Sequence, residues 1–144
     1  MRSARTKLEK AIPRKITSQW LWDIDACEGV IERFQELYPR GGEPSLDMLK
    51  AIATTAVELA HLVGKILSEA GCADYKKAHN AAVKRYNNVV AEIPSPTGLR
   101  GEDLAAWAAN YNQRERAARR RLYSKLANAL WNIVFPAKLQ KKRA

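Results

Sequence analysis

The sequence predicts an all-α fold, a single-domain bundle of four main helices, the last of them long, with a short helix at the N-terminus. Apolar residues recur every three or four positions through the middle of the chain, no segment alternates like a β-strand, and stretches rich in Pro and Gly separate the periodic segments. With 144 residues, 47% of them hydrophobic, the chain is the size of one domain and can bury a core. We therefore expect residues 1–144 to form one helical unit.

The first expected elements are a short helix at residues 3–12 and a main helix at residues 18–38. Ser18 is a suitable N-cap, and the apolar stripe after it repeats at spacings of four and three as far as Tyr38. The sequence Pro39-Arg40-Gly41-Gly42 should end this helix, because proline cannot continue it and paired glycines favour a loop.

The second and third main helices are expected at residues 45–71 and 74–93. Ser45 is again a good cap, and the apolar segment after it is expected to be the central helix, with a stop at Gly71. The third helix begins near Asp74 and places tyrosines, alanines and valines on one side. Residues 94–98, with two prolines and a glycine, form the clearest linker in the chain.

The fourth helix is expected to run from about residue 102 to Phe135. Glu102 and Asp103 suit its first turn, where the helix dipole favours acidic side chains. Residues 110–121 contain few apolar side chains, so this helix either breaks there or has an exposed centre.

Basic residues are concentrated toward the two ends of the chain. The sequence has 25 Lys and Arg against 15 Asp and Glu, a formal charge of +10. Residues 1–18 form a basic N-terminal segment of +5, residues 114–144 carry +9 and include a basic C-terminal tail at 136–144, and the middle carries −4. A uniformly basic surface would not give this pattern. Clustered basic residues favour binding to an acidic partner.

Composition and spacing exclude several other classes. Cys27 and Cys72 cannot make a disulfide framework, and the chain shows neither a signal-peptide pattern nor an apolar run of about 18 residues. We therefore expect a cytoplasmic protein without a membrane partner. The N-terminal segment has too little apolar face to insert well into an anionic membrane, which leaves attachment through the basic ends as a weak alternative.

No residue pattern indicates catalysis. His61 and His79 have no partners at zinc spacing, and we interpret His61 as a polar edge residue beside Glu58. An acidic row could bind a metal or perform acid–base chemistry with a partner row, but it is better explained as a solvated helix edge: Asp25, Glu28, Glu32 and Glu36. A phosphate loop and a nucleophile elbow are also missing. We expect no catalytic residue, no metal site and no cofactor.

The arginine run in the fourth helix is the strongest functional signal. Guanidinium groups match phosphate oxygens in pairs, and at about 100° per residue these side chains surround the helix rather than form one stripe. A solvated helix with a solubilising tail is the alternative. The expected nucleic-acid-binding residues are Arg114, Arg116, Arg119, Arg120, Arg121 and Lys125 on the helix, and Lys141, Lys142 and Arg143 in the tail.

Three residues of the fourth helix call for separate interpretation. Glu115 falls on the apolar face, where a carboxylate needs a partner, and Arg119 one turn later is the expected one. Trp131 and Phe135 lie in a segment that is apolar nearly all round. They are either core residues or anchors of a protein interface.

Residues 26–39, ACEGVIERFQELYP, precede Arg40, a Gly-Gly pair and a new helix. This segment resembles part of the short helical proteins encoded by bacteriophages, in which a Cys-containing helix ends in Phe or Tyr, Pro, any residue and Gly. Residues 75–92 are similar to the Tyr- and Ala-rich helical repeats that often follow it. The resemblance implies a phage or prophage setting and no mechanism.

Two functions fit these observations. The first is sequence-independent binding of DNA or RNA without catalysis, alone or as a small helical subunit of a nucleoprotein complex. The second is a phage-encoded module that docks on a host defence or replication protein through Trp131, Phe135 and nearby arginines.

Overall fold

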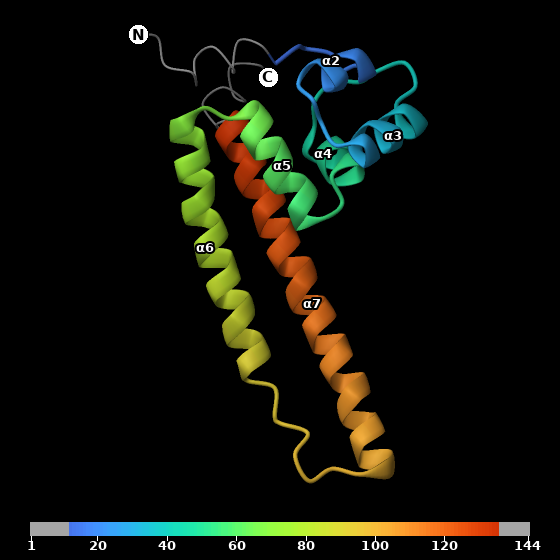
Figure 1. Cartoon of the computed structure of the whole chain (residues 1–144), viewed down its shortest axis with the longest axis vertical. Helices are drawn as coiled ribbons and strands as arrows, with labels where there is room; N and C mark the ends of the chain where they lie inside the picture. Colours follow the sequence, from blue (N-terminus) through green and yellow to red (C-terminus); the bar gives the residue numbers. More distant parts are fainter. Residues whose placement is uncertain (1–11, 136–144) are drawn as a thin grey trace.

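The computed structural model describes residues 12–135, and these residues form helices joined by short loops, without a strand (Figure 1). The all-α class is confirmed. Residues 12–135 contain six helices rather than four main ones: α2 (Ser18–Asp23), α3 (Glu28–Leu37), α4 (Leu46–Ile52), α5 (Ala56–Ile66), α6 (Glu69–Ala91) and α7 (Gly101–Val134). The expected short helix at residues 3–12 and the tail at 136–144 fall almost wholly outside the described residues.

Two parts of the described chain differ in shape. Helices α6 and α7 lie side by side and, with their connection at residues 92–100, form a long antiparallel hairpin (Figure 1). Helices α2–α5, here called the head, gather at the end of the hairpin opposite that connection, and α4 and α5 pack on α7. None of the helices within residues 12–135 is long and apolar enough to cross a membrane.

The helix expected at residues 18–38 is wrong in its continuity, because the chain breaks between α2 and α3. Thr17 rather than Ser18 caps α2, its side chain accepting from the Trp20 N–H. At the end of α2, Asp25 adopts a left-handed φ of 58°, and the Ala26 N–H donates to the Leu21 carbonyl at 3.0 Å. This is the hydrogen-bond pattern of a Schellman cap, which ends a helix and redirects the chain.

The helix expected at residues 45–71 also divides. Ser45 caps α4 as predicted, accepting from the Met48 N–H at 3.0 Å. The chain then breaks at residues 53–55, and Thr55 caps α5. Ser68 caps α6, so Gly71 lies inside the first turn of that helix instead of stopping the one before it.

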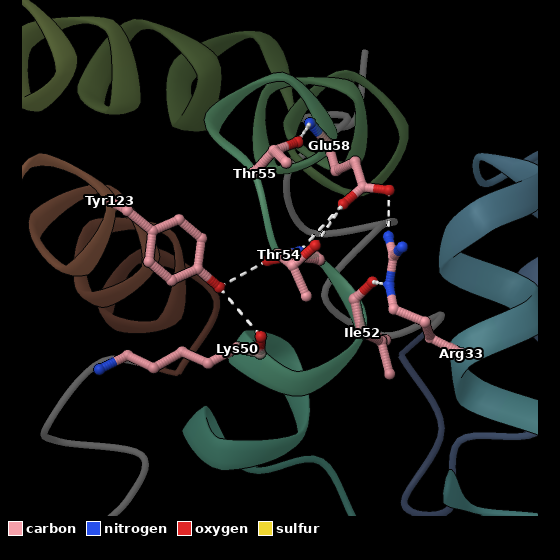
Figure 2. Close-up of polar contacts among 8 residues, drawn as sticks. Arg33, Lys50, Ile52, Thr54, Thr55, Glu58 and Tyr123 are labelled. Carbon is pink, nitrogen blue, oxygen red and sulfur yellow. Dashed lines mark hydrogen bonds and ion pairs between the residues drawn. The ribbon is translucent and has the colours of Figure 1, made fainter. Parts of the chain in front are cut away.

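A polar network holds the break between α4 and α5 (Figure 2). The Tyr123 hydroxyl of α7 lies 3.1 Å from the Lys50 carbonyl oxygen and 2.5 Å from that of Ala53. From the opposite side, the Arg33 Nε of α3 donates to the Ile52 carbonyl at 2.9 Å. Carbonyl groups that a continuous helix would have paired are thus satisfied by side chains from two other helices.

Glu58 completes this network at the start of α5. It forms an ion pair with Arg33 and accepts from the Thr54 N–H at 3.0 Å (Figure 2). Burial raises the pKa of the Glu58 carboxyl, but hydrogen bonds from Arg33 and Thr54 and the charge of Arg33 together lower it below its usual value. The loop between α4 and α5 is therefore fixed by ionic and backbone contacts.

The hydrophobic core lies between the head and the C-terminal half of α7. Its most deeply buried large side chains come from α2, α3, α5 and α7: Leu21, Val30, Ile31, Phe34, Leu59, Leu62, Leu126 and Leu130. Farther along the hairpin, residues 101–121 of α7 bury only Glu115 and Ala118. This part of the helix packs on α6 and leaves most of its circumference to solvent, and it contains the arginine run.

Candidate nucleic-acid interface

Helix α7 is continuous through the polar stretch that the sequence left open as either a break or an exposed centre. It runs unbroken over 34 residues, or about 50 Å at about 1.5 Å per residue. Residues 112–114 are exposed, as are most residues from 116 to 121. Ala, Arg, Gln and Glu are strong helix formers, so the segment stays helical although few of its side chains are buried.

The predicted cations of α7 are all exposed, and they occupy different sides of the helix. Arg114, Arg121 and Lys125 follow the flank beside α6, whereas Arg116 and Arg120 point outward. Among these residues and Arg119, only Arg119 forms an ion pair with a described residue. The predicted tail residues lie outside the described part of the chain: Lys141, Lys142 and Arg143.

Glu115 has the partner that the sequence predicts. It is 8% exposed, and Arg119 donates to its Oε1 from Nε at 3.0 Å and from Nη2 at 2.6 Å. The Tyr86 hydroxyl of α6 donates to the same oxygen at 2.8 Å, a contact that sequence reasoning missed. Tyr86 lies on the predicted apolar side of its helix, but only the pairing of α6 with α7 shows which group its hydroxyl reaches.

This three-residue contact shifts two ionisation equilibria. The hydrogen bond from Tyr86, followed by that from Arg119, lowers the pKa of Glu115 below its usual value. The bond to Glu115 in turn raises the pKa of Tyr86. Glu115 is therefore ionised at neutral pH and engages Arg119, whereas the other arginines of the run have no ion-pair partner among residues 12–135.

Glu115→Gln is expected to destabilise the protein at neutral pH, because the amide cannot offer Arg119 a charged acceptor. A lowered folded pKa stabilises the fold above the unfolded value of about 4.5, and this contribution disappears as the pH falls through the folded value. The difference in unfolding free energy between wild type and Glu115→Gln should therefore shrink from about pH 7 to about pH 3. Urea unfolding at several pH values measures it, and a constant difference would contradict an ionised Glu115.

Helix α6 adds basic residues that the sequence alone did not predict for the site. Lys84 and Arg85 are exposed, and Arg85 lines a hollow between α6 and α7 together with Arg121 and Lys125. Residues 69–134 contain eleven Lys and Arg and six Asp and Glu, whereas residues 18–66 contain four and eight. The hairpin thus carries +5 and the head −4. The net charge of residues 19–113, taken as one segment, does not show this division.

Trp131 and Phe135, the candidate interface anchors, lie against the head. Phe135 is 7% exposed, Trp131 is half-buried, and their ring centroids are 4.4 Å apart. Both line an apolar pocket of about 70 Å³ with residues such as Trp20 and Met48. Ile12 lines the same pocket, so the first and last described residues, Ile12 and Phe135, lie close together.

The remaining candidates have structural contacts or face solvent. The His61 Nε2 lies 3.1 Å from the Asp25 carbonyl oxygen and links α5 to the turn after α2, a contact that the sequence did not predict. The acidic row of Asp25, Glu28, Glu32 and Glu36 is exposed. Across residues 12–135, no group of three His, Cys, Asp or Glu side chains is placed to hold a metal ion. Comparison with known proteins gives no matching family model, no matching curated protein and no matching solved structure.

Proposed function

We propose that this protein binds nucleic acid without catalysis, gripping phosphates with the basic side of the α6–α7 hairpin and with its basic termini. One observation carries the proposal: five exposed cations of α7 have no ion-pair partner among residues 12–135, and Arg85 of α6 joins them. Unpaired surface cations grouped on one arm of a molecule are the electrostatic footprint of a phosphate-binding surface.

The arrangement suits contact with a phosphate backbone rather than with base edges. Arg114 and Lys125 are eleven residues apart, about 16 Å along the helix, so one helix side spans several phosphates. Asn110, Asn112 and Gln113 offer neutral donors nearby. The acidic head would be repelled by the same polyanion, which orients the hairpin toward it. The expected binding is independent of sequence and open to DNA or RNA.

Affinity for a generic labelled oligonucleotide is expected to fall steeply with salt, because binding releases counterions from the phosphates. Fluorescence anisotropy between about 50 and about 300 mM salt measures the slope of log K against log salt. Arg114→Ala, on the flank beside α6, should weaken binding and reduce the slope by about 0.7–0.9, the value for one lost phosphate contact.

Arg40→Ala in the head is the matched control for that experiment. Arg40 is also exposed, and its removal changes the net charge by the same amount. It should leave the affinity and the salt slope near the wild-type values. An affinity that does not change with salt, or an equal loss in both variants, would count against a phosphate-binding hairpin.

The alternative, a module that docks on a host protein, has less support. Its proposed anchors, Trp131 and Phe135, are already packed on each other and against the head. Capture of a partner protein that survives nuclease treatment would favour this alternative. Loss of the partner on nuclease treatment would instead indicate bridging through nucleic acid.

A further inference from the structure

We infer that the nucleic acid bound by the hairpin is single-stranded and that the hollow between α6 and α7 receives one of its nucleotides. The inference rests on the proposed function and makes it more specific. It assigns the base to the floor of the hollow and the flanking phosphates to its rim.

The hollow has the size and lining for such a group. Its volume is about 180 Å³, whereas about 10–15 Å³ suffices for one water molecule. Its apolar floor is formed by Ala82, Val89, Ala118 and Leu122. The rim carries Arg85 of α6 and Arg121 and Lys125 of α7, and no acidic side chain lines the hollow.

An apolar floor inside a cationic rim selects a ligand that is both flat and anionic. A nucleotide of a single strand offers an exposed base beside its own phosphate. A duplex keeps its bases stacked inside, and turning one out costs a few kcal/mol. A duplex would therefore reach the rim arginines but leave the floor unused.

The position of Tyr86 supports a preformed site. Its ring lines the hollow, while its hydroxyl is held by Glu115, which Arg119 fixes in turn. The buried Glu115 contact thus positions one wall of the hollow. Asn128, also on the lining, supplies an amide able to hydrogen-bond the edge of a base.

A second aromatic group extends the same path toward the tip of the hairpin. Trp107 and Tyr111 stack with ring centroids 5.2 Å apart, and the Trp107 Nε1 donates to the Pro94 carbonyl at 2.6 Å. At about 100° per residue, Trp107 falls on the flank of α7 that carries Arg114 and Lys125. Aromatic rings alternating with cations along a groove are typical of single-strand binding, in which bases stack and phosphates pair.

The first test compares strands with the full chain. A single-stranded oligonucleotide of mixed sequence and the duplex made from it are titrated at the same salt concentration by anisotropy. We expect the single strand to bind at least about tenfold more tightly, the size of one stacked base. Equal or tighter duplex binding would overturn the inference and leave the proposed function standing, whereas no binding of either would overturn both.

Matched variants locate the strand. The pair Arg121→Ala with Lys125→Ala removes two charges from the rim, and the pair Arg116→Ala with Arg120→Ala removes two from the outward side. Both pairs lose the same long-range attraction, so a difference between them reports direct contact with the strand. The rim pair should weaken single-strand binding about tenfold more than the outward pair. Equal losses would overturn the inference.

A variant that fills the hollow and keeps every charge distinguishes the contribution of the base to binding from that of the phosphates. Val89→Trp places a bulky ring over the floor, and its thermal unfolding is checked against wild type. It should weaken single-strand binding by about tenfold and leave duplex binding unchanged. If Val89→Trp does not fold, the two charge pairs still decide the question.

Discussion

Phe34→Ala is expected to lower the free energy of unfolding by about 3–5 kcal/mol, the usual cost of truncating a buried phenylalanine. Phe34 is 1% exposed at the centre of α3, and its ring stacks on Tyr38 with centroids 5.5 Å apart. Truncation removes apolar contacts with the core and leaves a cavity that the surrounding helices fill only in part. Unfolding in urea or guanidinium chloride, followed by circular dichroism, measures the loss.

Leu37→Ala is the matched control on the same helix. Leu37 is 53% exposed, so its truncation should change the stability by no more than about 0.5 kcal/mol. A similar small loss for Phe34→Ala would contradict the packing of α3 described above.

The Phe34 result also tests whether the head and the hairpin unfold together. Phe34 of α3 and Leu126 and Leu130 of α7 belong to one contiguous core cluster. Much of the helical signal comes from α6 and α7, which together contain 57 residues, 23 and 34 respectively. A destabilised head should therefore shift the whole transition rather than produce a separate phase.

Apolar periodicity predicted the all-α class and the extent of the last helix, and residue type predicted the cap at Ser45 and the linker at residues 94–98. The breaks inside the first two predicted helices could not be predicted. Periodicity reports which side of the chain faces the core, and it persists across a break when both pieces pack on the same core.

The groups that stabilise those breaks lie far away in sequence. His61 and Lys65 of α5 form hydrogen bonds to Asp25 in the turn after α2. At the turn of residues 53–55, the Tyr123 hydroxyl donates a hydrogen bond to the carbonyl of Ala53, 70 residues away in the sequence. Contacts of this kind arise only after the helices pack, so local propensity carries no signal of them.

For the candidate site, the sequence identified the cations but not their surroundings. The Glu115–Arg119 pair was predictable because the two residues are one helical turn apart. The role of Arg85 and the existence of the hollow were not, since both depend on which side of α6 packs against α7. Pairing these helices converts a ring of arginines into one flank that borders a hollow and one that faces solvent.

The separation of charge between head and hairpin bears on how a polyanion would approach. With −4 over residues 18–66 and +5 over residues 69–134, the described part of the chain has an electrostatic polarity along its length. Long-range attraction would orient the hairpin toward phosphates before contact, and raised salt would weaken this effect. Short-range contacts in the hollow would then add the selectivity that steering cannot provide.

Gly41→Ala is expected to lower the unfolding free energy by at least about 2 kcal/mol, for two separate reasons. Gly41 has a φ of 79°, which disfavours a residue with a Cβ, and that Cβ would lie 2.6 Å from the Ile16 carbonyl oxygen. Ile16 and Gly42 exchange two backbone hydrogen bonds, of 2.7 and 3.1 Å, that seat the buried Ile16 side chain beside the loop between α3 and α4. A clash with backbone oxygen cannot be relieved by rotating a side chain, so this bridge must open or shift.

Gly98→Ala separates the two causes. Gly98 has a similar φ of 84°, but a Cβ there would meet no atom within 4 Å. The unfolding free energy of Gly98→Ala should therefore fall only by the cost of the left-handed conformation, about 1 kcal/mol. Denaturant unfolding measures the loss of stability in both variants, and the difference between the two losses is the cost of the clash at Gly41. Equal losses would mean that the Ile16–Gly42 bridge does not restrain the loop, and that the glycine at position 41 is required by its backbone conformation alone.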